Sequence, residues 1–289
     1  MASKPFDSVI IGFDGSAQSA DAVAVGGLMG SLGSSGIVLA YIALHKPPFE
    51  RQTREYAQAR RQHVDTVLEP ALAAFEGRER VEPASIDSSS PARGLHDLAH
   101  EYGKYGSCLL AIGSAHRGPF GRVLLGSVGE GLISGCPCPI VVAPRGFSER
   151  APKSFARVVA GFDASPESRR ALRVAAELAA AAGVELEAVA VHHSSRLGHG
   201  NGGGDHREEL QQALDAAVGG LDAKGTLVEG DPVERLAAAA GGEDLLVLGA
   251  RNWGPHQHVF VGSVSSKLVR TAPSPVLVLP RGTAEGDQP

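Results

Sequence analysis

Short apolar runs alternate with amphipathic stretches along the chain, and this alternation predicts strands and helices in turn. The runs are bounded by glycine, proline and polar residues, as buried strands are. The stretches between them have the composition of surface helices. In the first half the expected strands are 7–13, 36–43, 81–86, 108–112 and 139–144, and the expected helices are 17–31, 50–76, 92–102 and 127–135.

The second half shows the same alternation. Its expected strands are 156–162, 185–191, 225–229, 245–248 and 275–279, and its expected helices are 166–182, 206–219, 232–240 and 263–271. Strands that alternate with helices predict an α/β fold in which parallel sheets carry helices on both faces. Ligands of such sheets bind beyond the carboxyl ends of the strands, where the strand order reverses.

The two halves are copies of one another. The segment Phe6–Ser16 returns as Phe155–Ser165, so that Asp163 is the counterpart of Asp14. We therefore expect a tandem duplication with domains at 1–146 and 147–289. The polar segment that joins the copies is short. A short joint favours a pseudo-dimer paired through the last strands of the two sheets, 139–144 and 275–279.

Composition and charge narrow the functional classes. The 289 residues are 43% hydrophobic and 20% charged, with a formal net charge of −5. This balance is that of a globular protein and argues against nucleic acid or an anionic membrane as the main partner. The start of the chain lacks the apolar region of a secretory signal, and no apolar run approaches the ~18 residues of a membrane span. With only three cysteines, a disulfide framework is not expected, so we expect a cytoplasmic protein.

Two side-chain groups invite a chemical interpretation, but a structural one is favoured. His96 and His100 lie one helical turn apart, yet the glutamate of a metalloprotease motif is missing, so a solvated helix face is expected. Cys108, Cys136 and Cys138 lie in or beside apolar runs, and core packing is the default. No catalytic residue and no metal ligand is predicted.

One interval of thirteen residues occurs in both copies and predicts an anion site. Gly113 closes an apolar run, and thirteen residues later come Gly126, Ser127 and Val128 at the start of a helix. Such a helix start gathers unpaired amides, which suit a phosphate. The second copy repeats this interval with Gly249, Gly262, Ser263 and Val264.

Asp14 and Asp163 end the first strand of each copy, so the topology brings them to the same edge as the glycine intervals. A carboxylate there accepts hydrogen bonds from a ribose hydroxyl or a base amine, or holds a metal through water. The structural alternative is that these aspartates and the serines beside them only cap the next helices.

These motifs resemble the universal stress protein family over residues 5–281. The resemblance rests on Asp14-Gly15-Ser16 after its apolar run, on the two glycine intervals, and on the Pro-containing last strands at 138–142 and 274–278. It implies five-strand, Rossmann-like parallel sheets that pair through their last strands, and ATP as ligand, with or without magnesium. It also implies that Ile42 and His193 contact the adenine. The alternative for His193, favoured by its residue type, is that it simply ends a strand.

The family's nucleotide loop, G-x2-G-x9-G-[ST], is incomplete in this chain. His116 and Asn252 replace the middle glycine in the two copies. Both residue types tolerate left-handed backbone and can donate to phosphate, so retained binding is the favoured prediction.

Three functions stay open. The first is an ATP-binding stress-response regulator with at most slow hydrolysis. The second is a nucleotide-free protein-interaction module with degenerate loops, and the third is an enzyme of adenylate chemistry. The protein partner and association of two chains stay open too.

Overall fold

The computed structural model describes residues 5–44, 54–114, 127–133, 136–193, 203–250 and 263–280. In the first copy the strands and helices alternate as the sequence predicts. They are β1 Ser8–Gly12, α1 Ala17–Ser31, β2 Gly36–Leu44, α2 Arg54–Ala73, β3 Val81–Ser88, α3 Pro91–Gly103, β4 Cys108–Gly113, α4 Ser127–Ile133 and β5 Ile140–Ala143.

The second copy repeats this order after a short helix, α5 Phe147–Arg150, in the joining segment. The short polar joining segment does not predict α5 from its sequence. The elements that follow are β6 Arg157–Phe162, α6 Pro166–Ala182, β7 Glu185–His192, α7 Gly203–Val218, β8 Lys224–Glu229, α8 Pro232–Ala239, β9 Leu245–Gly249, α9 Ser263–Thr271 and β10 Val276–Leu279.

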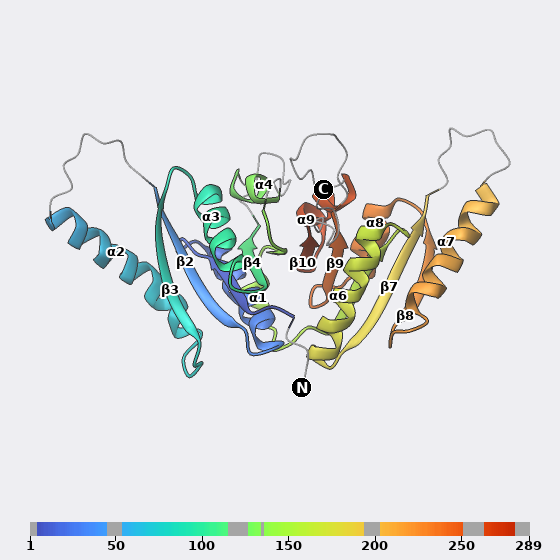
Figure 1. Cartoon of the computed structure of the whole chain (residues 1–289), viewed down its shortest axis with the longest axis horizontal. Coiled ribbons are helices and arrows are strands. Elements are labelled where there is room, and N and C mark those ends of the chain that lie inside the picture. The colour runs from blue at the N-terminus through green and yellow to red at the C-terminus, as the bar shows by residue number, and fades with distance from the viewer. Residues whose placement is uncertain are drawn as a thin grey trace.

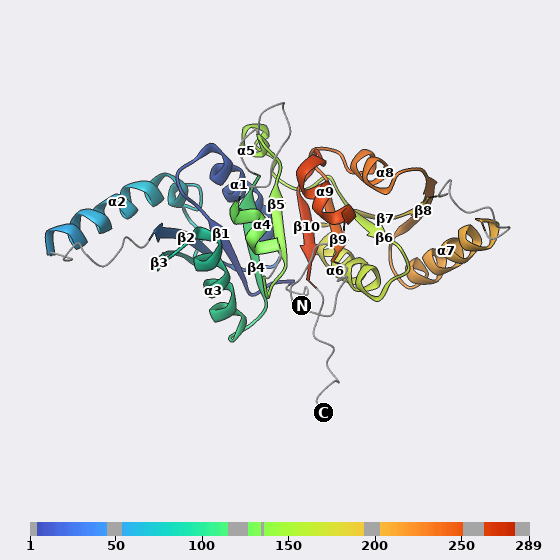
Figure 2. The ribbon, with the colours of Figure 1, turned by 90° about the horizontal axis from the view of Figure 1, so that it is seen from above.

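All ten of these strands form one continuous sheet, in the order β3-β2-β1-β4-β5-β10-β9-β6-β7-β8. Every pair within a copy is parallel, whereas β5 and β10 join the copies as an antiparallel pair in which Val142 lies opposite Val276. Figure 1 shows the first copy on the left and the second on the right, and Figure 2 shows β5 beside β10 at the centre. The expected pairing through the last strands is confirmed.

The helices cover both faces of the sheet. One apolar core packs beneath α1, α2, α6 and α7, and the other beneath α3, α4, α8 and α9. Consecutive residues of β1 serve the two cores in turn, because Val9 and Ile11 belong to the first and Ile10 to the second. This explains why the strands appear in the sequence as unbroken apolar runs.

Helix starts are set by local signals that the two copies share. Ser16 caps α1 and Ser165 caps α6, each by accepting from the amide three residues ahead. Ser90 and Asp231 cap α3 and α8, and each is followed by a proline at the first helical position. The caps fix where these helices begin at the carboxyl edge of the sheet.

The joining segment is fastened to both copies. The carboxylate of Asp21 in α1 accepts from the amide of Gly146 at 2.9 Å and from the amide and hydroxyl of Ser148 at 2.8 and 2.7 Å. On the other side, Arg150 donates to the carbonyl oxygen of Gly242 at 2.9 Å.

Among the described residues, no helix has both the length and the hydropathy to cross a bilayer.

Candidate functional site

Each copy has a pocket at the carboxyl ends of its strands, beside its first strand. In both copies this is where the strand order reverses, since β1 lies between β2 and β4, and β6 lies between β7 and β9. The first pocket has a volume of about 310 Å³ and the second about 400 Å³. Both fall at the lower end of the range of ligand clefts, about 300–1,000 Å³.

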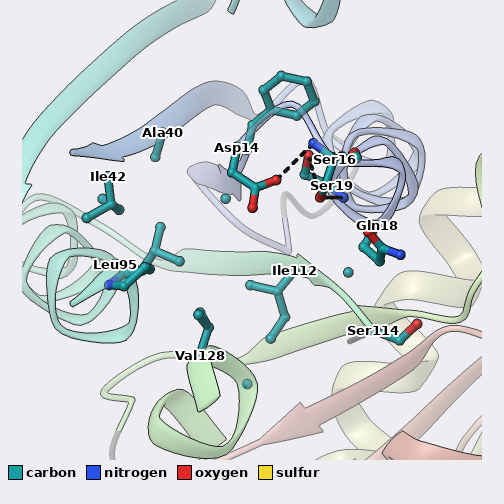
Figure 3. A pocket seen from close by; sticks show the side chains of 15 residues that line it. Asp14, Ser16, Gln18, Ser19, Ala40, Ile42, Leu95, Ile112, Ser114 and Val128 are labelled. Atoms are coloured by element: carbon teal, nitrogen blue, oxygen red, sulfur yellow. Dashed lines mark hydrogen bonds between the residues drawn. The ribbon is translucent and has the colours of Figure 1, made fainter. Parts of the chain in front are cut away.

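The first pocket has one acidic wall and one apolar wall. Asp14 follows β1, and its carboxylate faces the interior of the pocket (Figure 3). The opposite wall consists of apolar side chains from β2, α3, β4 and α4, which are Ala40, Ile42, Leu95, Ile112 and Val128. A flat apolar group and a hydroxyl-bearing group can therefore be held side by side in this pocket.

Asp14 is held by the turn into α1. The amide of Ser16 donates to its Oδ1 at 3.0 Å, and the hydroxyl of Ser16 in turn accepts from the amide of Ser19 at 3.2 Å. Burial raises the pKa of Asp14, but hydrogen bonds from Ser16 and Ser19 more than offset it and leave the pKa below its usual value. The carboxylate is therefore ionised at neutral pH and acts as an acceptor.

Gly113 has a packing role at the edge of this pocket. A Cβ atom placed on it would lie 1.8 Å from the carbonyl oxygen of Gln18 in the first turn of α1. A Cβ on Gly249 in the second copy would likewise lie 2.6 Å from the carbonyl oxygen of Glu167. Both glycines are required for backbone to pass backbone, whatever the pocket binds.

The second pocket repeats the first with different side chains. Asp163 follows β6, and the amide of Ser165 donates to its Oδ1 at 3.0 Å. Ala164 adopts a φ of 61° where the first copy has Gly15 at a φ of 85°. This turn is therefore left-handed in both copies. The apolar wall comes from β7, α8, β9 and α9, with Val191, Leu236, Leu248 and Val264.

The register of the strands places a residue other than His193 at the position equivalent to Ile42. Ala40 pairs with Gly12, and Val189 pairs with the equivalent Gly161, so the counterpart of Ile42 is Val191. Val191 lines the second pocket. His193 lies two residues further on, is exposed, and has its Nδ1 3.1 Å from the carbonyl oxygen of Gly230.

The structure brings most of the other predicted site residues together. Asp14, Ile42, Gly113 and Val128 line the first pocket, and Asp163, Gly249, Ser263 and Val264 line the second. Ser127 begins α4 beside the first pocket. His116, Gly126, Asn252 and Gly262 lie outside the described residues.

Sequence reasoning missed the contribution of the helix starts. Gln18, Ser19 and Pro91 line the first pocket, and Ser168 and Pro232 line the second. A usable signal was present, because a serine followed by a polar residue three positions on, or a capping residue followed by proline, marks a helix start. Helix starts at this edge necessarily border the crevice.

Comparison with known proteins places both copies in one family. The family model described as "Universal stress protein family" matches twice, at residues 5–144 and 154–280. A universal stress protein of Mycolicibacterium smegmatis is 28% identical over 290 residues, covering 94% of this chain and 96% of that protein. One of Mycobacterium tuberculosis is 29% identical over 206 residues, covering 66% of this chain and 69% of the relative.

Solved structures share the architecture over nearly the whole chain. A universal stress protein from Archaeoglobus fulgidus superposes with a TM-score of 0.68 at 22% identity, covering 96% of this chain and 99% of that one. A putative universal stress protein from Pseudomonas aeruginosa superposes with a TM-score of 0.65 at 15% identity, covering 96% and 94%. With two family matches that together span most of its length, the chain belongs to the universal stress protein family.

Proposed function

We propose that this protein is a stress-response regulator that binds ATP in each of its two pockets. The observation that carries the proposal is the pairing of an aspartate with an apolar wall, repeated in both copies at the point where the strand order reverses. In this assignment Ile42 and Val191 form the adenine wall. Asp14 and Asp163 accept hydrogen bonds from the ribose hydroxyls.

The phosphates are assigned to the stretch that opens α4 and α9. Ser127 and Ser263 begin these helices, and Ser263 lines the second pocket. The assignment extends to Gly126 and Gly262, which precede them in the sequence, and to His116 and Asn252, whose side chains can donate to phosphate. Magnesium, where it accompanies ATP, would be held by the phosphates and through water by the nearby aspartate.

The proposal includes no catalytic residue and at most slow hydrolysis. It also places the protein in the cytoplasm, in keeping with the three free cysteines. A nucleotide-free interaction module is the competing function. It is favoured by one observation, because Gly113 and Gly249 are explained by packing and do not by themselves require a nucleotide.

Equilibrium binding of labelled ATP, with magnesium and with a chelator, separates the two functions. We expect saturable binding at two sites per chain. The variants Asp14→Asn and Asp163→Asn should each weaken one site by about 10- to 100-fold, because a charged acceptor of two hydroxyl donors is lost. Asp97→Asn, on an exposed surface of α3, is the matched control and should bind as the unaltered protein does.

The outcome that contradicts ATP binding is also clear. If the unaltered protein shows no saturable binding below the millimolar range, the interaction module is the better function. If binding persists at two sites in the double variant of Asp14 and Asp163, the nucleotide lies elsewhere. Mass analysis of gently purified protein gives an independent measure, because a nucleotide carried from the cell can be counted per chain.

A further inference from the structure

The three cysteines of the chain gather at one point of the first copy. Cys108 begins β4, and Cys136 and Cys138 lie in the connection between α4 and β5. All three cysteines are only 4–5% exposed and lie in the core beneath α3 and α4. The Sγ atoms of Cys136 and Cys138 are 3.4 Å apart, and the Cys108 thiol, which donates to the carbonyl oxygen of Ala99 at 3.4 Å, lies close enough to influence Cys138. Cys138 is therefore the shared centre of the cluster.

The fold does not require sulfur at these positions. Leu110 pairs with Ile140 in the first copy, and Leu246 pairs with Val276 in the second. The same offset in residue number therefore relates β4 to β9 and β5 to β10. This offset places Asp244, Ala272 and Ser274 at the three cysteine positions of the second copy. Alanine and serine thus fill the positions of Cys136 and Cys138 in an equivalent sheet.

The cluster also separates the thiols by acidity. The hydrogen bond with Cys138 lowers the pKa of Cys136 and that of Cys108, although burial opposes both shifts. Hydrogen bonds with both neighbours, together with burial, raise the pKa of Cys138. Cys136 therefore loses its proton more readily than Cys138, its neighbour at 3.4 Å. A thiolate beside a thiol is the arrangement that peroxides oxidise.

We propose that Cys136 and Cys138 are a reversible redox pair whose oxidant is hydrogen peroxide or a small organic peroxide. A metal site is not favoured, because among the described residues no group of three or more His, Cys, Asp or Glu side chains is arranged to hold a metal ion. A small, neutral oxidant suits thiols this deeply buried, since it needs only a brief local opening of the core.

The chemistry balances with hydrogen peroxide alone. The Cys136 thiolate attacks one oxygen, the O–O bond breaks, and a sulfenic acid forms while hydroxide leaves. The Cys138 sulfur then attacks the sulfenic sulfur, the S–O bond breaks, and a second hydroxide leaves. The thiol protons convert both hydroxides to water, so two thiols and one peroxide give one disulfide and two waters. A dithiol reductant reverses the change by thiol–disulfide exchange.

The pair is linked to the first pocket through α4. The amide of Cys136 donates to the carbonyl oxygen of Leu132 at 2.8 Å, and Val128 and Gly129 of the same helix line the pocket. The sulfurs are 3.4 Å apart, and closing this gap to the length of a covalent bond moves the connection. On the proposed function, oxidation therefore changes nucleotide affinity at the first pocket and leaves the second unchanged.

Peptide mapping tests the pair without any nucleotide. The native protein is treated with hydrogen peroxide, quenched with an alkylating reagent, unfolded and digested with trypsin. Cys136 and Cys138 share the tryptic peptide 123–145, whereas Cys108 lies in 105–117. We expect peptide 123–145 to become about 2 Da lighter, to resist alkylation and to recover both thiols after reduction. Peptide 105–117 should stay alkylated and separate.

Two results overturn the redox pair. One is that Cys136 and Cys138 remain fully alkylated after peroxide treatment of folded protein. The other is that peptide 105–117 becomes cross-linked to 123–145 while the internal disulfide never forms. Because neither readout involves ATP, failure of the pair and failure of nucleotide binding are separate results.

Matched variants sharpen the test. Cys138→Ser introduces the serine that the second copy carries at this position. It should abolish the loss of about 2 Da, because the attacking sulfur is missing. Cys108→Ser should retain that loss. If either buried variant fails to fold, the result on the unaltered protein still decides. If peptide 123–145 loses the same mass in Cys138→Ser as in the unaltered protein, Cys138 is not the sulfur that forms the disulfide.

Discussion

Gly113 passes so close to Gln18 that a single methyl group could not be placed between them, since a Cβ on Gly113 would lie 1.8 Å from the carbonyl oxygen of Gln18. We therefore expect Gly113→Ala to lower the free energy of unfolding by about 2 kcal/mol or more, through overpacking against backbone. Denaturant unfolding without nucleotide measures the change.

The matched control for Gly113 is Gly103, which ends α3. A Cβ atom added to Gly103 would have no neighbouring atom within 4 Å. Gly103→Ala should leave stability unchanged or raise it slightly, because alanine favours helix. If Gly113→Ala folds as stably as the unaltered protein and only nucleotide binding is lost, the glycine serves the ligand and not the packing.

Asp21 fixes the segment between the two copies. Its carboxylate belongs to a residue that is 2% exposed and accepts three hydrogen bonds from Gly146 and Ser148. In Asp21→Asn the charge is lost and an amide donor meets backbone donors, so we expect stability to fall by about 2–3 kcal/mol. Ser148→Ala removes only the hydroxyl contact and should cost about 1 kcal/mol. Equal effects of the two variants would argue against the carboxylate as the organising group.

Arg157 neutralises a buried acid in the second copy. It contacts Asp244 and Glu187 at 2.8 Å each, and the Asp244 side chain is only 6% exposed. Arg157→Ser leaves the Asp244 carboxylate without its cation and should cost about 3 kcal/mol. Lys224 also contacts Glu187 but is 75% exposed, so Lys224→Ser is the control and should cost less than about 1 kcal/mol. Denaturant unfolding at neutral pH distinguishes them.

Tyr102 should ionise late in an alkaline titration. Burial, and then its hydrogen bond to Glu82 and the charge of that carboxylate, raise the pKa of Tyr102 to about 12. An unfolded tyrosine ionises near pH ~10, so the native state holds this proton more tightly. The resulting stability is complete below about pH 10 and is lost as the pH rises through about 12.

Tyrosinate absorbance measures this step directly. The late step should vanish in Tyr102→Phe and move to lower pH in Glu82→Gln, where the carboxylate charge is gone. A titration curve of Tyr102→Phe that coincides with that of the unaltered protein, allowing for one tyrosine fewer, would contradict the shift.

The sequence was sufficient for the architecture because the duplication supplied each signal twice. Asp14 and Asp163 mark the ends of equivalent strands, and both copies keep the spacing from Gly113 and Gly249 to the next helix. The parallel sheets, the join through β5 and β10 and the edge that carries both pockets all follow from these repeats.

The sequence alone did not show the register of the strands, or which helix side chains extend into the pockets. The second-strand position fell on His193 instead of Val191. The offset that relates Asp14 to Asp163 also relates Ile42 to Val191, but it identifies the residue beside the crevice only if both copies share one register, which the pairing of β7 with β6 shows. Leu95 and Leu236 look like ordinary core residues of helices, yet their side chains also line the pockets. Neither fact is encoded in local periodicity, since both depend on segments far away in the chain.

The pairing of β5 with β10 has an evolutionary consequence. In a dimer of identical subunits every substitution appears on both sides of the symmetry axis, so each must be tolerated twice. Fusing both partners into one polypeptide removes that constraint, and each half can change alone. The halves here have done so at one equivalent location, where one holds a thiol, Cys108, and the other an ion pair, Asp244 with Arg157. Two copies in one chain can thereby divide labour inside a single molecule.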